Sequence, residues 1–283
     1  MTHRFRRHFI KGAVVAALAA CGCQFAFAEG GSLAALRARG QLTVGTEAAY
    51  APYEFVENGQ IVGYGRDILS YMVKKLGVKL NQLNLPFQGL LPGLLAHKFD
   101  FVATSVGITE QRAKRFAFTE PIGVVESLFV VRGDNHAINK VDDLAGKVVG
   151  TQMGSMAQPI VQAYDGELKK KMGRGYASLK LLQSYPDVET ALANGTIDVA
   201  VLPSNVLALD MRKNPGAFRV IGEAGQPKLL AWVVNPGDPE IRKFINDTLD
   251  EMRANGTLAK LQEKWFGKQL DLPTSGYLPE GAL

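Results

Sequence analysis

The sequence predicts an α/β protein built on mostly parallel sheets. Short β-like runs alternate with helical stretches along almost the whole chain, which is the order that parallel strands joined by crossover helices produce. Of the 283 residues, about 255 remain once a leader of about 28 residues is set aside. That length is enough for two modest lobes or one large domain.

The first 28 residues have the layout of a secretory signal peptide. Residues 2–11 are basic and contain no acid, residues 12–20 form a short apolar run, and Ala26-Phe27-Ala28 gives the small-x-small pattern that signal peptidase reads. The apolar run is too short to cross a bilayer as a stable helix. We therefore expect cleavage before Glu29 and a periplasmic protein.

Two alternatives concern the export route. Arg6-Arg7 and the residues after it resemble a twin-arginine signal, although Phe5 stands where Ser or Thr is usual. Leu18-Ala19-Ala20-Cys21 resembles a lipoprotein box, in which Cys21 would be acylated and would tether the protein to a membrane. The layout favours ordinary cleavage after Ala28 over lipidation.

Charge and cysteine content exclude several classes of function. The leader carries four of the 32 Lys and Arg residues and no acid, so 28 basic and 27 acidic residues remain, a net charge of about +1. No basic face remains that would favour nucleic acid as a partner. Both cysteines, Cys21 and Cys23, lie in the leader, which excludes a disulfide or thiol catalysis in the exported chain.

The elements of the first half follow in order. A short helix over Leu33 to Arg39 begins after Ser32 and ends at Gly40, a residue common at this position. Asn58-Gly59, between two apolar runs, predicts a tight hairpin. Further strands are expected at Leu42 to Gly45, Val78 to Leu85 and Phe99 to Ser105, and further helices over Asp67 to Leu76, over Leu90 to Lys98 and from Thr109.

The second half continues the alternation. Strands are expected at Ser127 to Val131, Lys147 to Gly150, Leu179 to Gln183, Ile197 to Leu202 and Leu229 to Val234. Helices are expected from Ser155 and over Pro186 to Asn194, Pro239 to Ala254 and Leu258 to Phe266. The tail from Leu270 to Leu283 contains several Pro and Gly residues and is expected to be loosely structured.

A set of segments resembles one known family. The segments are Leu42 to Phe55, Gly63-Tyr64 with Asp67-Ile68-Leu69, Gly89 to Leu94 with Lys98-Phe99-Asp100, Ile108 to Arg112 with Phe116 to Pro121, Met252 to Leu258, and Trp265-Phe266. Together they are similar to the amino-acid class of periplasmic solute-binding proteins of ATP-driven importers, called family 3. Each segment alone is weakly specific, but their order and spacing over Leu33 to Phe266 are highly specific.

The resemblance implies a type II periplasmic-binding-protein fold, with two α/β lobes joined by two crossing segments. Carried onto this sequence, the crossings fall at 128–131 and 229–233, the second lobe at 132–228, and a discontinuous first lobe at 29–127 and 234–283. Because few backbone positions cross between the lobes, the lobes can close on a ligand. The implied partners are a small molecule with a carboxylate and the membrane permease of an ABC importer; we expect a monomer without cofactor or metal.

Arg112 is the main candidate for ligand binding, because its position matches the carboxylate clamp of the family. A guanidinium offers a planar fork of donors that fits a carboxylate. Upstream, Thr104, Ser105 and Gly107 lead from a strand toward the Arg112 helix, where free N–H groups suit an anion. The alternative is a solvated surface Arg beside Lys114 and Arg115.

Aromatic and acidic positions complete the first-lobe prediction. By the resemblance, Tyr50 and Phe87 sandwich the ligand, where flat rings supply apolar contact and hold cationic groups at their faces. Core packing is the alternative for both, and for Phe55 it is the better interpretation. Glu47 could face a cationic group of the ligand, or it could be a surface acid at a strand end.

In the second lobe, Gly154, Ser155 and Ser204 are the predicted ligand contacts. A helix start at Gly154-Ser155 would present unpaired N–H groups and a hydroxyl, although Ser155 could equally be a simple N-cap. Family members usually carry an acid for the α-ammonium after the strand equivalent to Ile197 to Leu202. Here Pro203, Ser204 and Asn205 occupy that place and Gly107 replaces a common hydroxyl residue, so the mode of ammonium recognition is open.

Two other functions on the same fold compete with a transport role. Cyclohexadienyl dehydratases use this cleft for acid-catalysed elimination, which requires a proton donor facing the ligand. Glu47 is the sole candidate, and the sequence has no phosphate loop, no Ser-His-Asp arrangement and no metal-ligand cluster, so we expect no enzymatic activity. A ligand-sensing receptor module is the other alternative.

Overall fold

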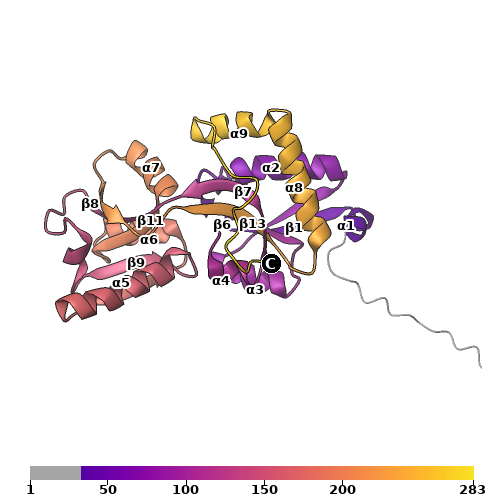
Figure 1. Cartoon of the computed structure of the whole chain (residues 1–283). Helices are drawn as coiled ribbons and strands as arrows, with labels where there is room; N and C mark the ends of the chain where they lie inside the picture. The colour runs from indigo at the N-terminus through magenta and orange to yellow at the C-terminus, as the bar shows by residue number, and fades with distance from the viewer. Residues whose placement is uncertain (1–32) are drawn as a thin grey trace, which may run out of the picture.

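Two lobes, each built on a five-stranded sheet, make up the chain in the computed structural model (Figure 1). The structure describes residues 33–283. The predicted signal peptide at 1–28, including the twin-arginine pattern and Cys21, lies outside the described residues. The predicted α/β fold with a discontinuous first lobe is confirmed, because strands from both ends of the described chain share one sheet.

The sheet of the first lobe has the strand order β5-β1-β6-β13-β7. Strand β1 pairs in parallel with β5 and β6, whereas β13 runs antiparallel between β6 and β7. The strands are β1 (Gln41–Thr46), β5 (Lys79–Asn84), β6 (Phe101–Gly107), β7 (Ala117–Val125) and β13 (Lys228–Val234). A small antiparallel sheet joins β2 (Ala49–Tyr50), β3 (Glu54–Glu57) and β4 (Gln60–Val62), with the predicted hairpin turn at Asn58 and Gly59.

Helices cover both faces of the first-lobe sheet. One face packs against α1 (Leu33–Arg39), α2 (Tyr64–Leu76), α8 (Pro239–Ala254) and α9 (Thr257–Phe266). The other face packs against α3 (Phe87–Leu95) and the single turn α4 (Glu110–Ala113), around buried Leu90 and Phe118. Among the described residues, no helix combines the length and apolarity needed to span a bilayer.

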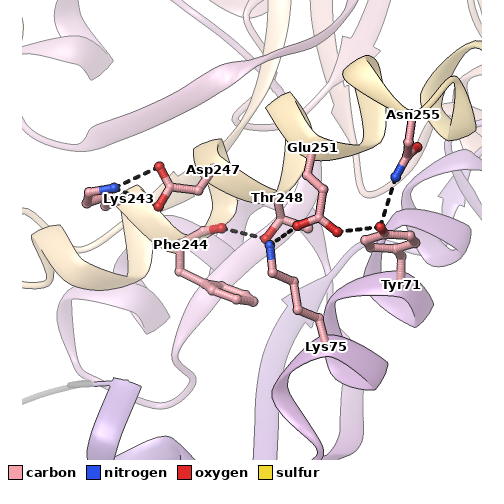
Figure 2. Close-up of polar contacts among 8 residues, drawn as sticks. All are labelled: Tyr71, Lys75, Lys243, Phe244, Asp247, Thr248, Glu251 and Asn255. Atoms are coloured by element: carbon pink, nitrogen blue, oxygen red, sulfur yellow. Dashed lines mark hydrogen bonds and ion pairs between the residues drawn. The ribbon is translucent and has the colours of Figure 1, made fainter.

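Polar contacts join α2 to α8 on the surface of the first lobe (Figure 2). The Tyr71 hydroxyl donates to Glu251 Oε1 at 2.6 Å, and Lys75 Nζ of the same helix bonds to Glu251 Oε2. Asn255 Nδ2 in turn donates to the Tyr71 hydroxyl at 3.1 Å. Exposed pairs of this kind contribute up to about 1 kcal/mol, so the two helices are held mainly by their apolar faces.

The second lobe is built on a sheet with the order β10-β9-β11-β8-β12. Its strands are β8 (Ser127–Arg132), β9 (Val148–Gln152), β10 (Ser178–Leu182), β11 (Val199–Pro203) and β12 (Phe218–Glu223). Strand β9 is parallel to β10 and β11, and β8 is antiparallel to β11 and β12. Helix α5 (Ala157–Met172) packs on one face, α6 (Tyr185–Ala193) and α7 (Ser204–Lys213) pack on the other, and a 3-10 turn η1 (Val141–Leu144) follows β8.

The chain passes between the two sheets twice. The first passage is Glu126, between β7 and β8, and the second is the loop 224–227, between β12 and β13. The ranges 128–131 and 229–233 form the strands that follow each passage, since β8 pairs with β11 and β12, and β13 pairs with β6 and β7. Both connections between the lobes are therefore short.

Five elements of the described chain were not predicted: β2, β7, η1, α7 and β12. Strand β7 contains Pro121, which breaks the sequence pattern of a strand, but β7 lies at the edge of its sheet, where Pro is tolerated. Helix α7 follows Pro203 directly and lacks a side-chain N-cap bond, so it has no clear start signal. Strand β12 is also an edge strand and contains an irregularity between Val220 and Gly222.

Candidate functional site

A cavity lies between the two lobes. Its lining from the first lobe is Glu47, Tyr50, Phe87, Thr104, Ser105, Gly107, Arg112 and Leu230, and its lining from the second lobe is Gln152, Ser155, Met156 and Tyr185. The cavity therefore collects every predicted site residue except Gly154 and Ser204. The carboxyl-terminal ends of β1, β6 and β9 all meet at this cavity, which is where parallel sheets present their functional groups.

Arg112 lies in the one-turn helix α4, half-buried at the cavity. The predicted helix start at Thr109 is confirmed, since its hydroxyl accepts from the Arg112 N–H at 3.3 Å. The guanidinium donates through Nη1 to the Gly107 carbonyl and through Nη2 to the Gly154 carbonyl, both at 2.9 Å. Burial lowers the pKa of Arg112 to about 10. Within residues 33–283 its guanidinium bonds to carbonyls and to no acid, and its remaining N–H donors suit a carboxylate.

Glu47, which follows the last residue of β1, is the acidic residue of the cavity lining. Its side chain is 5% exposed, and its carboxylate accepts from Nε2 of Gln152 in the opposite lobe. Burial raises the pKa of Glu47 to about 8, and the bond from Gln152 offsets part of this rise. A buried acid without a cation is costly, so Glu47 is suited to receive a positively charged group.

The rings of the cavity are held by their neighbours. Tyr50 stacks on Tyr53 with centroids 5.6 Å apart and lies 5.8 Å from Tyr185 of the second lobe. The ring of Phe87, at the first position of α3, lies under the Arg112 guanidinium at 5.6 Å. In contrast, Phe55 packs edge-on against Trp265 outside the cavity lining, in line with its interpretation as a packing residue.

Gly154 and Ser155 precede helix α5, which begins at Ala157 with Met156 as N-cap. Ser155 is therefore not a simple N-cap. Its Oγ is buried and has no hydrogen-bond partner among the described residues. The Tyr185 hydroxyl lies close enough for Ser155 to lower its pKa. Gly154 has φ of 76°, a conformation that favours glycine, and offers its carbonyl to Arg112.

Ser204 lies apart from the cavity, at the start of α7. Its Oγ accepts from the Glu126 N–H at 3.3 Å, at the first passage between the lobes. The next residue, Asn205, bridges the lobes: its Oδ1 accepts from the Tyr50 hydroxyl at 3.2 Å and its Nδ2 donates to the Ala51 carbonyl at 2.9 Å. Both groups of the Asn205 amide are thus engaged with the first lobe.

Sequence reasoning missed four lining residues, namely Gln152, Met156, Tyr185 and Leu230. Gln152 is a polar residue, 1% exposed, at the end of a buried strand, which is a signal that the sequence did contain. Tyr185 follows Ser184, whose hydroxyl accepts from Asp187 N–H at 3.3 Å and so fixes the start of α6. Met156 and Leu230 read as ordinary apolar residues.

The absence of a side chain at Gly107 follows from packing across the cleft. A Cβ at Gly107 would lie 2.3 Å from Sδ of Met156 in the second lobe. A hydroxyl residue there would have to displace Met156. Among residues 33–283, no group of His, Cys, Asp and Glu is arranged to hold a metal ion.

Comparison with known proteins gives a family match over most of the chain. The model described as "Bacterial extracellular solute-binding proteins, family 3" matches residues 42–268. The L-cystine-binding protein TcyJ of Escherichia coli (strain K12) is 31% identical over 265 residues, covering 92% of this chain and 96% of TcyJ. The probable amino-acid-binding protein YxeM of Bacillus subtilis (strain 168) is 28% identical, covering 92% of this chain and 94% of its own length.

Solved structures agree with these sequence matches. The P235GK mutant of ArgBP from T. maritima has a TM-score of 0.73 and 31% identity, covering 83% of this chain and 99% of that chain. The ancestral amino-acid-binding protein AncCDT-1, a precursor of cyclohexadienyl dehydratase, has a TM-score of 0.71 and 29% identity, with 83% and 98% covered.

Proposed function

This chain belongs to the bacterial extracellular solute-binding proteins of family 3, and we propose that it captures a small, amino-acid-like molecule with a carboxylate for the permease of an ABC importer. In this role the protein acts outside the cytoplasm, after export by the leader at 1–28. It works as a monomer, with one ligand held between its two lobes.

The observation that carries this proposal is one cavity with one basic and one acidic side chain, Arg112 and Glu47, neither of which has a charged partner among residues 33–283. In the described part of the chain, the Arg112 guanidinium donates to the carbonyls of Gly107 and Gly154, and the Glu47 carboxyl accepts from the amide of Gln152; none of these three groups is charged. A zwitterionic ligand would supply the missing carboxylate and the missing cation at once. Because Ser204 and Asn205 are engaged elsewhere, Glu47 is the group that receives the ammonium or guanidinium of the ligand.

The ligand class follows from this charge pattern and from the relatives. TcyJ is named for L-cystine, and ArgBP of T. maritima has been solved in an arginine-bound form. Both amino acids carry a carboxylate and at least one cationic group. Tyr50, Phe87 and Tyr185 would add apolar contact along the ligand and attraction between their ring faces and its cation.

Closure of the lobes would complete the site. The two passages between the lobes, at Glu126 and 224–227, would act as the hinge near the predicted crossings 128–131 and 229–233. The first lobe would bind first through Arg112, and the second lobe, 132–228, would close with Gln152, Ser155 and Gly154. A short, double connection allows this rotation while keeping both lobes rigid.

Purified protein without its leader should be tested by thermal shift against amino acids, opines and small carboxylates. L-Cystine or L-arginine at 100 times its Kd should stabilise the protein by about 2.7 kcal/mol. Calorimetry then gives the affinity. Equal melting temperatures with every compound of the panel would contradict the proposal.

An enzymatic function on the same fold is favoured by one observation. Glu47 has a pKa raised by burial to about 8, so a proton donor faces the cavity at neutral pH, and AncCDT-1 is named as a precursor of a dehydratase. We propose binding without catalysis, because the relatives TcyJ and YxeM are both named as binding proteins. Incubation with prephenate or arogenate decides the matter, since formation of product would overturn this part of the proposal.

A further inference from the structure

The C-terminal tail, residues 267–283, runs across the first lobe without regular secondary structure. It leaves α9 and ends beside α3 and α4, as the yellow trace in Figure 1 shows. The segment matched by the family model ends at residue 268, so nearly all of this tail lies beyond the matched part. Its path links helices on one face of the sheet to the helix that carries Arg112.

Apolar side chains dock the tail on the core beneath α3 and α4. Tyr277, Leu278 and Ala282 pack against the buried cluster that contains Phe87, Ile108, Ala113 and Phe116. Two of these four, Phe87 and Ala113, belong to α3 and α4. Phe87 also lies under the Arg112 guanidinium. The tail therefore packs on the same buried cluster as the ring that lies under the Arg112 guanidinium.

Hydrogen bonds fix the end of the tail between two helices. The Leu283 N–H donates to the Ala113 carbonyl at 2.9 Å, and Arg242 Nη1 of α8 donates to the Leu283 carbonyl at 3.2 Å. The Tyr277 hydroxyl lies within reach of the Arg242 and Asn246 side chains of the same helix. Helix α8 thus anchors the tail, and the tail holds Ala113, the residue after Arg112.

Helix α4 needs such support because it is a single turn. One isolated turn is unfavourable in water, since it fixes several residues for one or two hydrogen bonds. The turn is closed by two backbone bonds, from Ala113 N–H to the Thr109 carbonyl at 2.8 Å and from Lys114 N–H to the Glu110 carbonyl at 3.2 Å. The bond from Leu283 uses the Ala113 carbonyl, which the turn itself leaves free.

We propose that Tyr277 to Leu283 are positioning residues, a brace that holds α4 so that the Arg112 guanidinium faces the ligand carboxylate. This inference rests on the proposed function, because it assigns the tail to the affinity of that same site. The tail makes no contact with the ligand itself. Its effect on binding passes through Ala113 and Arg112.

The test removes the N–H donor of Leu283 and leaves the cavity lining intact. In Leu283→Pro the bond to Ala113 is lost, because proline has no N–H. Loss of one such bond should weaken the binding of L-cystine or L-arginine roughly 2- to 10-fold. The matched control is Leu270→Pro, which removes the bond from Leu270 N–H to Gln262 Oε1 at the other end of the tail and should leave affinity unchanged.

A second readout follows Arg112 without any ligand. Arginine side-chain ¹⁵N NMR, with the Arg112 signal assigned from Arg112→Lys, should show hindered rotation of the guanidinium in the full chain. Leu283→Pro should free that rotation, and Leu270→Pro should not. The proposed positioning role of the tail would be contradicted if the guanidinium stayed restrained in Leu283→Pro. It would also be contradicted if Leu283→Pro bound the ligand as tightly as the full chain.

The two readouts also separate this inference from the proposed function. If the full chain binds neither L-cystine nor L-arginine, the proposed ligand class fails, and the NMR comparison alone decides whether the tail positions Arg112. If binding is found and Leu283→Pro leaves it unchanged, the function stands and the brace fails.

Discussion

The two lobes meet at the same cavity but contribute different chemistry to it. The first lobe supplies the acidic and the basic residue of the lining, Glu47 and Arg112, whereas the second lobe supplies Gln152, Ser155, Met156 and Tyr185. Each charge of the first lobe is met by a neutral group of the second, a carbonyl or an amide. This asymmetry indicates that the first lobe binds the charges of the ligand, and the second lobe selects and encloses it.

The electrostatic cost of this arrangement falls on the first lobe. Burial lowers the pKa of Arg112 to about 10 and raises the pKa of Glu47 to about 8, so both shifts favour the neutral forms. A neutral hydrogen-bonding group from the other lobe relieves burial only in part. A ligand that carries both charges would favour the ionised form of Glu47 and would give the Arg112 cation a charged partner.

Substitution of Arg112 should have the largest effect on binding. Arg112→Ala leaves the ligand carboxylate buried without its cation, so affinity should fall by about 2–5 kcal/mol, roughly 30- to 4,000-fold. The matched control is Arg115→Ala, since Arg115 lies on the same segment over the Phe116 ring and outside the cavity. Calorimetry measures the affinity of both variants. An equal loss of affinity in Arg112→Ala and Arg115→Ala would contradict the assignment of carboxylate binding to Arg112.

Substitution of Glu47 should have the second largest effect, limited to cationic ligands. Glu47→Gln removes the acceptor charge, so affinity for L-arginine should fall by about 1.5–3 kcal/mol. Glu57→Gln, at the exposed end of β3, is the control and should bind as the full chain does. If glutarate, which has no cation, lost as much affinity in Glu47→Gln as L-arginine, the role of Glu47 would be structural.

The same residue should make stability depend on pH. The pKa of Glu47 is about 8 in the folded chain, against the ordinary value of 4.5. Between these values the folded state keeps a proton that the unfolded state has lost. The contribution of Glu47 to stability is therefore fully present below about pH 4.5 and is lost as pH rises toward 8. The slope from one such group reaches at most about 1.4 kcal/mol per pH unit.

Melting temperatures from pH 5 to 8 measure this slope. Burial also raises the pKa of Glu54 to about 8, so the full chain carries contributions of the same sign from both acids. Glu47→Gln should therefore flatten the curve without abolishing it. If the curve of Glu47→Gln kept its full slope, the raised pKa of Glu47 would be contradicted. The proposed role of Glu47 in binding the cationic group of the ligand would then lose its support.

The same asymmetry separates what the sequence could predict from what it could not. Arg112, Glu47 and Tyr50 lie in first-lobe segments with a specific local pattern, and the cavity collects them. Ser204 was placed by its position after β11, but its hydroxyl turns to Glu126, and Asn205 beside it bonds to the first lobe. Contacts that exist only when two distant lobes meet leave little local signal in the sequence.

Packing across the cleft explains the remaining differences. Gln152 and Met156 are assigned to the cavity only once the second lobe is placed against the first, where Met156 fills the space beside Gly107. The tail is a similar case. Its Pro and Gly residues predict irregular backbone correctly, but the docking of Tyr277 and Leu278 on the α3 and α4 side depends on long-range packing.

The smallest expected effect concerns Asn205, which joins the lobes without lining the cavity. Asn205→Ala removes bonds to the Tyr50 hydroxyl and the Ala51 carbonyl, both part-buried, so closure should weaken by about 0.5–1.5 kcal/mol. Because all the charges that hold the ligand remain on the first lobe, this loss should appear mainly as faster dissociation, with an unchanged association rate. Stopped-flow fluorescence separates the two rates, and Ser204→Ala, which alters the neighbouring contact with Glu126, serves as the control. If Asn205→Ala slowed association instead, the second lobe would take part in first capture, and the division of labour between the lobes would fail.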